Sequence, residues 1–92
     1  MPKESSLIDH IRVYINMVGG KVIKIAQNGF SEAGIPDLLI FEPTRTYMVE
    51  AKAPGKKPTP IQLAKIKEIQ KAGGKVFWTD SFQDFCKKRD RL

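Results

Sequence analysis

Cysteine is almost absent from this chain of 92 residues, and its single thiol, Cys86, has no partner for an internal disulfide. The sequence also lacks any apolar run close to the roughly 20 residues that a membrane-spanning helix needs. Its first residues do not form the apolar core of a signal peptide. With one histidine, the chain has no second imidazole to share a metal ion. These absences exclude a disulfide framework, and we expect a cytoplasmic protein that does not enter the membrane.

The charge balance is basic, with 16 lysines and arginines against 10 acidic residues and a net charge of +6. Such a surplus attracts polyanions, and nucleic acid is the expected one. A membrane surface, or a charge that serves only solubility, is a weaker interpretation. Part of it lies in mid-chain at Lys52, Lys56 and Lys57, and part at residues 87–91. The length allows one compact core, so we expect a single domain over residues 1–92.

Hydrophobic spacing and turn residues predict three helices and four strands. The expected helices cover residues 4–18, 60–72 and about 81–88, and the expected strands cover residues 21–26, 35–41, 46–51 and 75–79. Short links between the first three strands predict an antiparallel meander, whereas the helix between the third and fourth predicts a parallel pair. The fold class is therefore α/β: a mixed four-stranded sheet flanked by helices, in the order α-β-β-β-α-β-α.

The strand over residues 35–41 is nearly all apolar, and we expect it to be covered on both faces. Turn residues 42–45 join it to the strand that follows. If Pro43 and Thr44 form a two-residue loop, Asp37 lies directly opposite Glu50. A four-residue loop would instead place Asp37 beside Lys52. Asp37, Glu50 and Lys52 share one face in both cases, because side chains alternate along a strand; an odd loop or a bulge would separate them.

Two carboxylates that face each other across a strand pair repel, and a divalent cation would remove this repulsion. Carboxylate oxygens, water and a substrate phosphate together suit Mg²⁺. A cation bound there could activate a water molecule, with Lys52 beside it as a positive charge. A lone Glu-x-Lys or Pro-Asp is usually a solvated face or a turn. Here both lie in otherwise apolar strands, where charged residues need a partner or a function.

These residues resemble the motif of the PD-(D/E)XK nuclease superfamily, with Pro36-Asp37 followed by Glu50-Ala51-Lys52. The surrounding residues 34–39 and 49–62 are similar to the VRR-NUC family. The resemblance implies that Asp37, Glu50 and the carbonyl of Ala51 bind Mg²⁺ or Mn²⁺, and that Lys52 is the catalytic lysine.

The resemblance also implies an acidic residue on the first helix and a glutamine on the second, which correspond to Glu4 and Gln62. Glu4 shares the inward face of its helix and could reach the metal through water, but a glutamate in the first turn also favours the helix dipole. Gln62 faces the sheet, yet it is also the third residue of a capping box that begins at Thr59. We expect these two roles of Gln62 to need different rotamers.

Several residues outside the motif also have expected roles. Lys56 and Lys57 suit contacts with substrate phosphates, although ordinary loop lysines are an equal alternative. Gly34 is expected to adopt a positive φ or to allow a close backbone approach ahead of the motif. Residues 28–31 could form a loop that faces the substrate, with an exposed turn favoured. His10 is expected on the helix surface rather than in a catalytic role.

The function that these residues favour is metal-dependent endonucleolytic cleavage of DNA. Free-standing members of the VRR-NUC family resemble Holliday-junction resolvases, and this implies selectivity for branched DNA and action as a homodimer; the small size suits a bacterial or phage gene. Two alternatives remain: a non-catalytic nucleic-acid-binding module, and a nuclease subunit whose specificity comes from a partner protein.

Overall fold

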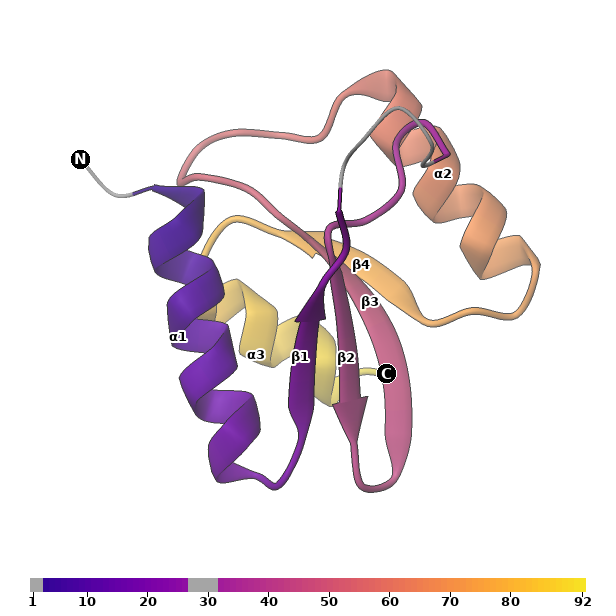
Figure 1. Cartoon of the computed structure of the whole chain (residues 1–92). Coiled ribbons are helices and arrows are strands. Elements are labelled where there is room, and N and C mark those ends of the chain that lie inside the picture. The colour runs from indigo at the N-terminus through magenta and orange to yellow at the C-terminus, as the bar shows by residue number, and fades with distance from the viewer. Residues whose placement is uncertain (1–2, 27–31) are drawn as a thin grey trace.

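A computed structural model describes residues 3–26 and 32–92. The elements are α1 (Glu4–Met17), β1 (Lys21–Lys24), β2 (Leu38–Glu42), β3 (Arg45–Ala51), α2 (Pro60–Lys71), β4 (Val76–Thr79) and α3 (Phe82–Asp90) (Figure 1). This order is the one that the sequence predicts. The observed bounds differ most from the expected ones on either side of the loop between the first two strands. β1 ends at Lys24 rather than at residue 26, and β2 begins at Leu38 rather than at residue 35. The loop expected over residues 28–31 lies outside the described residues.

The four strands form one sheet in the order β1-β2-β3-β4. The pairs β1–β2 and β2–β3 are antiparallel and the pair β3–β4 is parallel, which confirms the predicted meander and crossover. Glu42 pairs with Arg45, so that Pro43 and Thr44 form a two-residue loop, the first of the two alternatives that the sequence leaves open. An even loop keeps alternate residues of both strands on matching faces, which is the condition on which the predicted carboxylate cluster depends.

The main core lies on one face of this sheet, where α1 and α3 pack against it (Figure 1). Ile11 and Ile15 of α1 and Phe85 of α3 are fully buried there. The strands contribute their alternate apolar residues to the same core: Val22, Leu38, Ile40, Tyr47, Val49, Ala51 and Phe77. Burial of these side chains supplies the main free energy that holds the helices on the sheet.

The opposite face is only partly covered, and the expectation that residues 35–41 are covered on both faces is wrong. Figure 1 shows α2 beside β4 and away from β1. Ile66 is the one residue of α2 that is buried. Ile23 and Phe41 keep 43% and 40% of their surface exposed, because they point away from α1 and α3 and α2 does not reach over them. Within residues 3–26 and 32–92, no helix is long and apolar enough to cross a bilayer.

Candidate active site

The open end of the β2–β3 hairpin, opposite its turn, carries the two carboxylates of the motif. The backbone ladder continues one residue before β2, since the Ile25 N–H donates to the Asp37 carbonyl at 2.7 Å. Leu38 pairs with Val49, which places Asp37 across from Glu50. The Ala51 N–H donates to Asp37 Oδ1 at 3.1 Å and fixes that carboxylate. Asp37 is 5% exposed and Glu50 is 4% exposed, so both carboxylates are largely removed from solvent.

Burial and mutual repulsion disfavour the charged forms of both groups. Burial raises the pKa of Asp37 to about 6; the Ala51 N–H opposes this shift and the nearby Glu4 carboxyl adds to it. Burial also raises the pKa of Glu50 to about 7, and the Asp37 charge contributes in the same direction. Lys52 opposes this rise in the pKa of Glu50 but does not cancel it. The site therefore holds more negative charge than its own residues neutralise.

Lys52 lies at the same end of β3, as the sequence predicts. Its Nζ is 3.6 Å from Glu50 Oε2 and its side chain is 16% exposed. The Lys52 N–H donates to the Thr79 carbonyl at 2.8 Å, so β4 fixes the backbone that carries the lysine. The ammonium is thus close to the carboxylates and accessible from the solvent side.

Gln62 joins the site from α2 without leaving its capping box, so the expectation of two competing rotamers is wrong. Its Oε1 accepts from the Thr59 N–H at 2.9 Å, and its own N–H donates to Thr59 Oγ1 at 3.2 Å. The other end of the same amide, Nε2, donates to Glu50 Oε2 at 3.5 Å. The physical reason is that an amide carries its acceptor and its donor on opposite atoms, and each serves one role.

Glu4 lies in the first turn of α1, with its carboxyl close enough to raise the pKa of both Asp37 and Glu50. Its side chain faces inward as predicted, and its position also suits the helix dipole. The two interpretations of Glu4 are therefore compatible in this geometry. The cluster of Glu4, Asp37 and Glu50 gathers three acidic side chains at one end of the sheet.

The loop after β3 carries Lys56 and Lys57, and both side chains are exposed. This loop has an anchor that sequence reasoning missed: Asp80 Oδ2 accepts from the Gly55 N–H at 3.1 Å. Ser81, and not Asp80, caps the last helix, because its Oγ accepts from the Asp84 N–H. Asp80 is thereby free to hold a loop 25 residues away, a contact for which the sequence carries no local signal.

Gly34 has a positive φ of 76° and approaches the first turn of α2 closely. A Cβ at this position would lie 2.6 Å from the Ile61 carbonyl oxygen. Nearby, Lys65 Nζ of α2 lies 2.7 Å from Glu32 Oε2. Both features of Gly34 that the sequence predicts are confirmed, and together these contacts fasten the segment before Asp37 to the helix that carries Gln62.

The donor set suits a hard divalent cation. Among residues 3–26 and 32–92, no three acidic, histidine or cysteine side chains are arranged to hold a metal ion by themselves. Asp37 and Glu50, with the Ala51 carbonyl, would hold such an ion, because carboxylate and carbonyl oxygens are the ligands that Mg²⁺ prefers. The observation that fits is the pair of buried carboxylates facing each other with one lysine beside them, because a cation would relieve their repulsion and favour their charged forms.

A mixed sheet with two carboxylates, a lysine and a glutamine at one end defines a nuclease-like α/β core. A family model described as the VRR-NUC domain matches residues 10–83. A solved structure described as a VRR_NUC domain superposes with a TM-score of 0.82 at 32% identity, covering 98% of this chain and 97% of the other. A phage protein named "Putative nuclease p44", from Acyrthosiphon pisum secondary endosymbiont phage 1, is 35% identical over 80 residues, which is 86% of this chain and 84% of that protein. The chain belongs to the VRR-NUC family of nuclease domains.

Proposed function

We propose that this nuclease is a divalent-metal-dependent endonuclease that hydrolyses DNA phosphodiester bonds. The observation that carries the proposal is the buried Asp37–Glu50 pair, whose negative charge Lys52 offsets only in part. A structural role would be served better by a neutral or fully paired site, since repelling buried carboxylates cost stability. The pair therefore suits a cation and an anionic substrate that arrive together.

Each residue has a distinct role in this proposal. Asp37, Glu50 and the Ala51 carbonyl hold Mg²⁺ or Mn²⁺, with Glu4 acting through a water molecule. Bound there, the ion supplies a Lewis acid and an activated water. Lys52 holds the attacking oxygen by its positive charge. Gln62 donates to Glu50 Oε2 and keeps that carboxylate directed into the site. Lys56 and Lys57 contact substrate phosphates from the exposed loop.

The substrate that we propose is branched DNA, cut by a homodimer in the manner of a Holliday-junction resolvase. The basic surplus of +6 supports a polyanionic substrate. A short chain has little surface for reading bases, which favours recognition of DNA shape. A symmetric dimer would place two active sites on two strands. The exposed apolar side chains of the open sheet face, Ile23 and Phe41 among them, offer area for such an association.

The test is cleavage of a labelled four-way junction and a matched linear duplex by the purified chain with Mg²⁺ or Mn²⁺. We expect the junction to be cut, and Asp37→Ala and Glu50→Ala to abolish cutting while leaving binding largely intact. Asp9→Ala is the matched control, because Asp9 is an exposed carboxylate on α1. Gel filtration with light scattering measures the oligomeric state.

Robust cutting by both variants, or no cutting by the wild type with either metal on any DNA or RNA substrate, would overturn the proposed chemistry. Binding of nucleic acid without cleavage would instead assign the chain to the non-catalytic alternative. Cleavage that appears only after a partner protein is added would assign it to the subunit alternative.

A further inference from the structure

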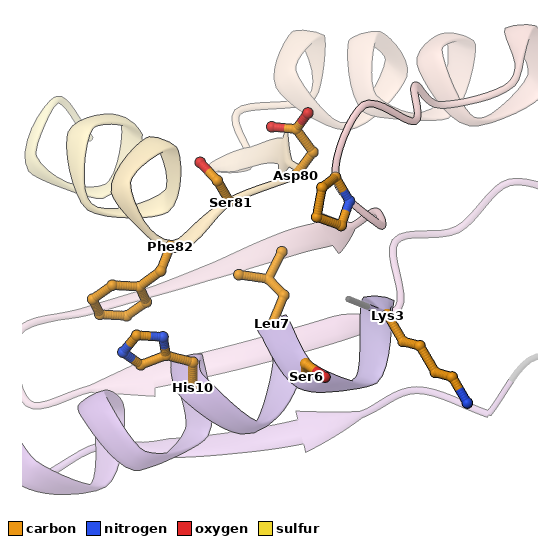
Figure 2. Close-up of a pocket in the computed structure, with 8 residues that line it drawn as sticks. Lys3, Ser6, Leu7, His10, Asp80, Ser81 and Phe82 are labelled. Carbon is orange, nitrogen blue, oxygen red and sulfur yellow. The ribbon is translucent and has the colours of Figure 1, made fainter. Parts of the chain in front are cut away.

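A pocket of about 270 Å³ lies between the first turns of α1, the loop after β3 and the junction of β4 with α3 (Figure 2). It adjoins the catalytic end of the sheet on the side of α3. Lys3 at its rim precedes Glu4, and Pro54 follows Lys52 by two residues. Asp80 follows Thr79, the residue whose carbonyl accepts from the Lys52 N–H. These neighbours place the pocket at the same end of the sheet as the carboxylates, on the side that α1 and α3 cover.

The lining of the pocket is mainly apolar and partly aromatic. Leu7, only 8% exposed, points from α1 toward the Asp80–Phe82 segment (Figure 2). The Phe82 ring stacks on His10 with a centroid distance of 3.7 Å and an angle of 6° between the planes. Pro54 adds a further apolar wall. Phe82 and His10 cover each other's ring faces, and Phe82 also stacks on Phe85. The apolar side chains that border the pocket therefore suit an uncharged group rather than an ion.

The charges at the pocket do not suit a phosphate. Lys3 is the one lysine or arginine among the lining residues, and its ammonium extends away from the other labelled side chains (Figure 2). Asp80 contributes a carboxylate that is held by the Gly55 N–H. An anion in the pocket would thus meet a negative group and no inward-pointing lysine or arginine. An uncharged base fits this lining, and Lys3 is left to contact the outer backbone of the same strand.

We propose that the pocket receives an unpaired base of the strand whose phosphodiester bond lies at Asp37 and Glu50. This inference rests on the proposed function, because it requires nucleic acid at the catalytic end. A base in an intact duplex would first have to be extruded, at a cost of unstacking and unpairing. A bulged, flapped or single-stranded base carries little of that cost. The chain should therefore prefer strands with an unpaired nucleotide next to the cleaved bond.

The experiment measures binding without cleavage, in buffer that contains EDTA. Fluorescence anisotropy compares a linear duplex with the same duplex carrying a one-nucleotide bulge. We expect the bulged duplex to bind about tenfold more tightly, because its unpaired base leaves water for a pocket lined largely by apolar surface. A bulged 2-aminopurine should change its fluorescence on binding, because its base leaves solvent for the pocket.

Ser6→Trp is the decisive variant, because Ser6 lines the pocket and an indole there would fill it. We expect it to bind both duplexes with the wild-type affinity for the linear one and to give no 2-aminopurine response. Ser5→Trp is the matched control, since Ser5 is exposed on the same helix and does not line the pocket. Ser6→Leu, a smaller filling residue, repeats the test if Ser6→Trp fails to fold.

Equal affinity of the wild type for linear and bulged duplexes would overturn the proposal. So would a bulge preference that survives in the folded Ser6 variants, or a preference that depends on a terminal phosphate rather than on the base. None of these outcomes depends on catalysis. A wild-type protein that never cleaves would overturn the proposed nuclease chemistry, and the base preference would still be measured.

Discussion

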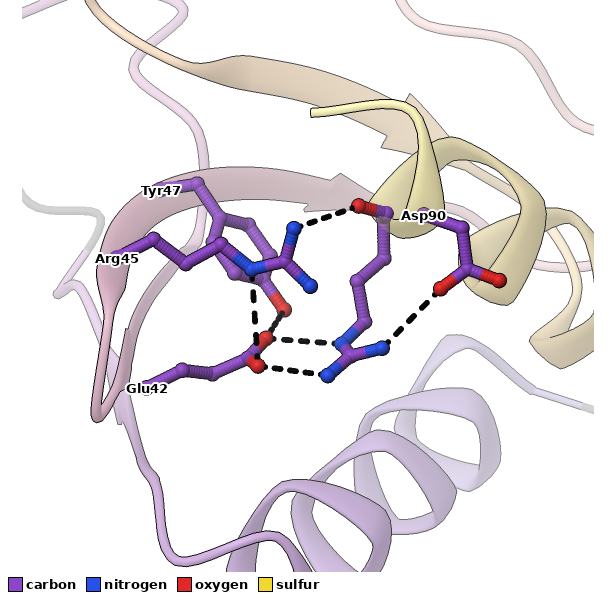
Figure 3. A network of polar contacts seen from close by, with 5 residues as sticks. Glu42, Arg45, Tyr47 and Asp90 are labelled. Atoms are coloured by element: carbon purple, nitrogen blue, oxygen red, sulfur yellow. Dashed lines mark hydrogen bonds and ion pairs between the residues drawn. The ribbon is translucent and has the colours of Figure 1, made fainter.

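The β2–β3 hairpin carries buried carboxylates at both of its ends. The two ends differ in the partners of these carboxylates and in the direction in which their pKa is shifted. At the turn, Glu42 accepts two hydrogen bonds from Arg89, at 2.9 and 2.7 Å, and one from the Tyr47 hydroxyl at 2.5 Å (Figure 3). Arg45 Nε lies 3.7 Å from the same carboxylate. Burial alone would raise the pKa of Glu42, but the Arg89 and Tyr47 hydrogen bonds and the arginine charges hold it below its usual value.

At the open end, burial raises the pKa of Asp37 to about 6 and that of Glu50 to about 7. Burial does not distinguish the two ends, since the side chains of Glu42 and Glu50 are both 5% exposed. The two ends differ in their number of positive partners. At the turn two arginines lie beside one carboxylate, whereas at the open end one lysine lies beside a cluster of carboxylates. The carboxylate at the turn is fully paired within the chain, while the carboxylates at the open end have less positive charge around them, and the proposed cation would supply it.

Breaking the complete end should have the largest effect on stability. Glu42→Ala removes the shared acceptor and leaves Arg89, whose side chain is 15% exposed, without its main partner. We expect a loss of about 3–5 kcal/mol in the free energy of unfolding, the usual cost of breaking a buried ion pair on one side. Urea unfolding measures it. Glu68→Ala is the control, because that carboxylate is 68% exposed in its pair with Lys65 and should cost below about 1 kcal/mol. Similar losses in the two variants would refute the distinction.

The open end should respond to pH with the opposite sign. The pKa of Asp37 and that of Glu50 are higher in the folded protein, so the folded state binds more protons between about pH 4 and 7. The metal-free protein should therefore lose stability as the pH rises through that range, by about 3 kcal/mol for one such carboxylate taken alone. Glu42, with its lowered pKa, contributes stability above its unfolded pKa and loses it as the pH falls through the folded value.

Asp37→Asn and Glu50→Gln isolate this effect, because each removes one charge from the cluster with little change of shape. Both should raise the thermal stability of the metal-free protein near pH 7.5. Mg²⁺ or Mn²⁺ should stabilise the wild type at this pH by favouring the charged carboxylates, and should stabilise the variants less. Thermal scans with and without metal measure both. A wild type that metal does not stabilise, with variants no more stable than it, would show that the open end is not a strained anionic site.

The sequence predicts the open end better than the turn because the signals for the open end are local. An even loop at Pro43–Thr44 keeps the motif residues on one face in either register, and the position of Gly34 just ahead of the motif suggests its positive φ. Glu42 appears in the sequence only as a turn residue, since its partner Arg89 lies 47 residues away on another element. The coverage of a sheet face is similarly non-local, because it depends on where α2 comes to lie. The spacing of apolar residues predicts which face of a strand is apolar, but it does not predict which helix packs on that face.

The smallest effect is expected for Gln62, which caps α2 and also donates to Glu50 at the open end. Two substitutions distinguish these roles. Thr59→Ala removes the Oγ1 that accepts from the Gln62 N–H but keeps the Thr59 N–H that holds Oε1. Gln62→Ala removes the capping contact and the Nε2 donor to Glu50 together. Both should cost about 1 kcal/mol of stability through the cap. Gln62→Ala should in addition lower the cleavage rate about tenfold relative to Thr59→Ala, because Glu50 loses a donor. Urea unfolding and single-turnover cleavage at saturating Mn²⁺ measure the two effects, and equal rates would reduce Gln62 to a helix cap.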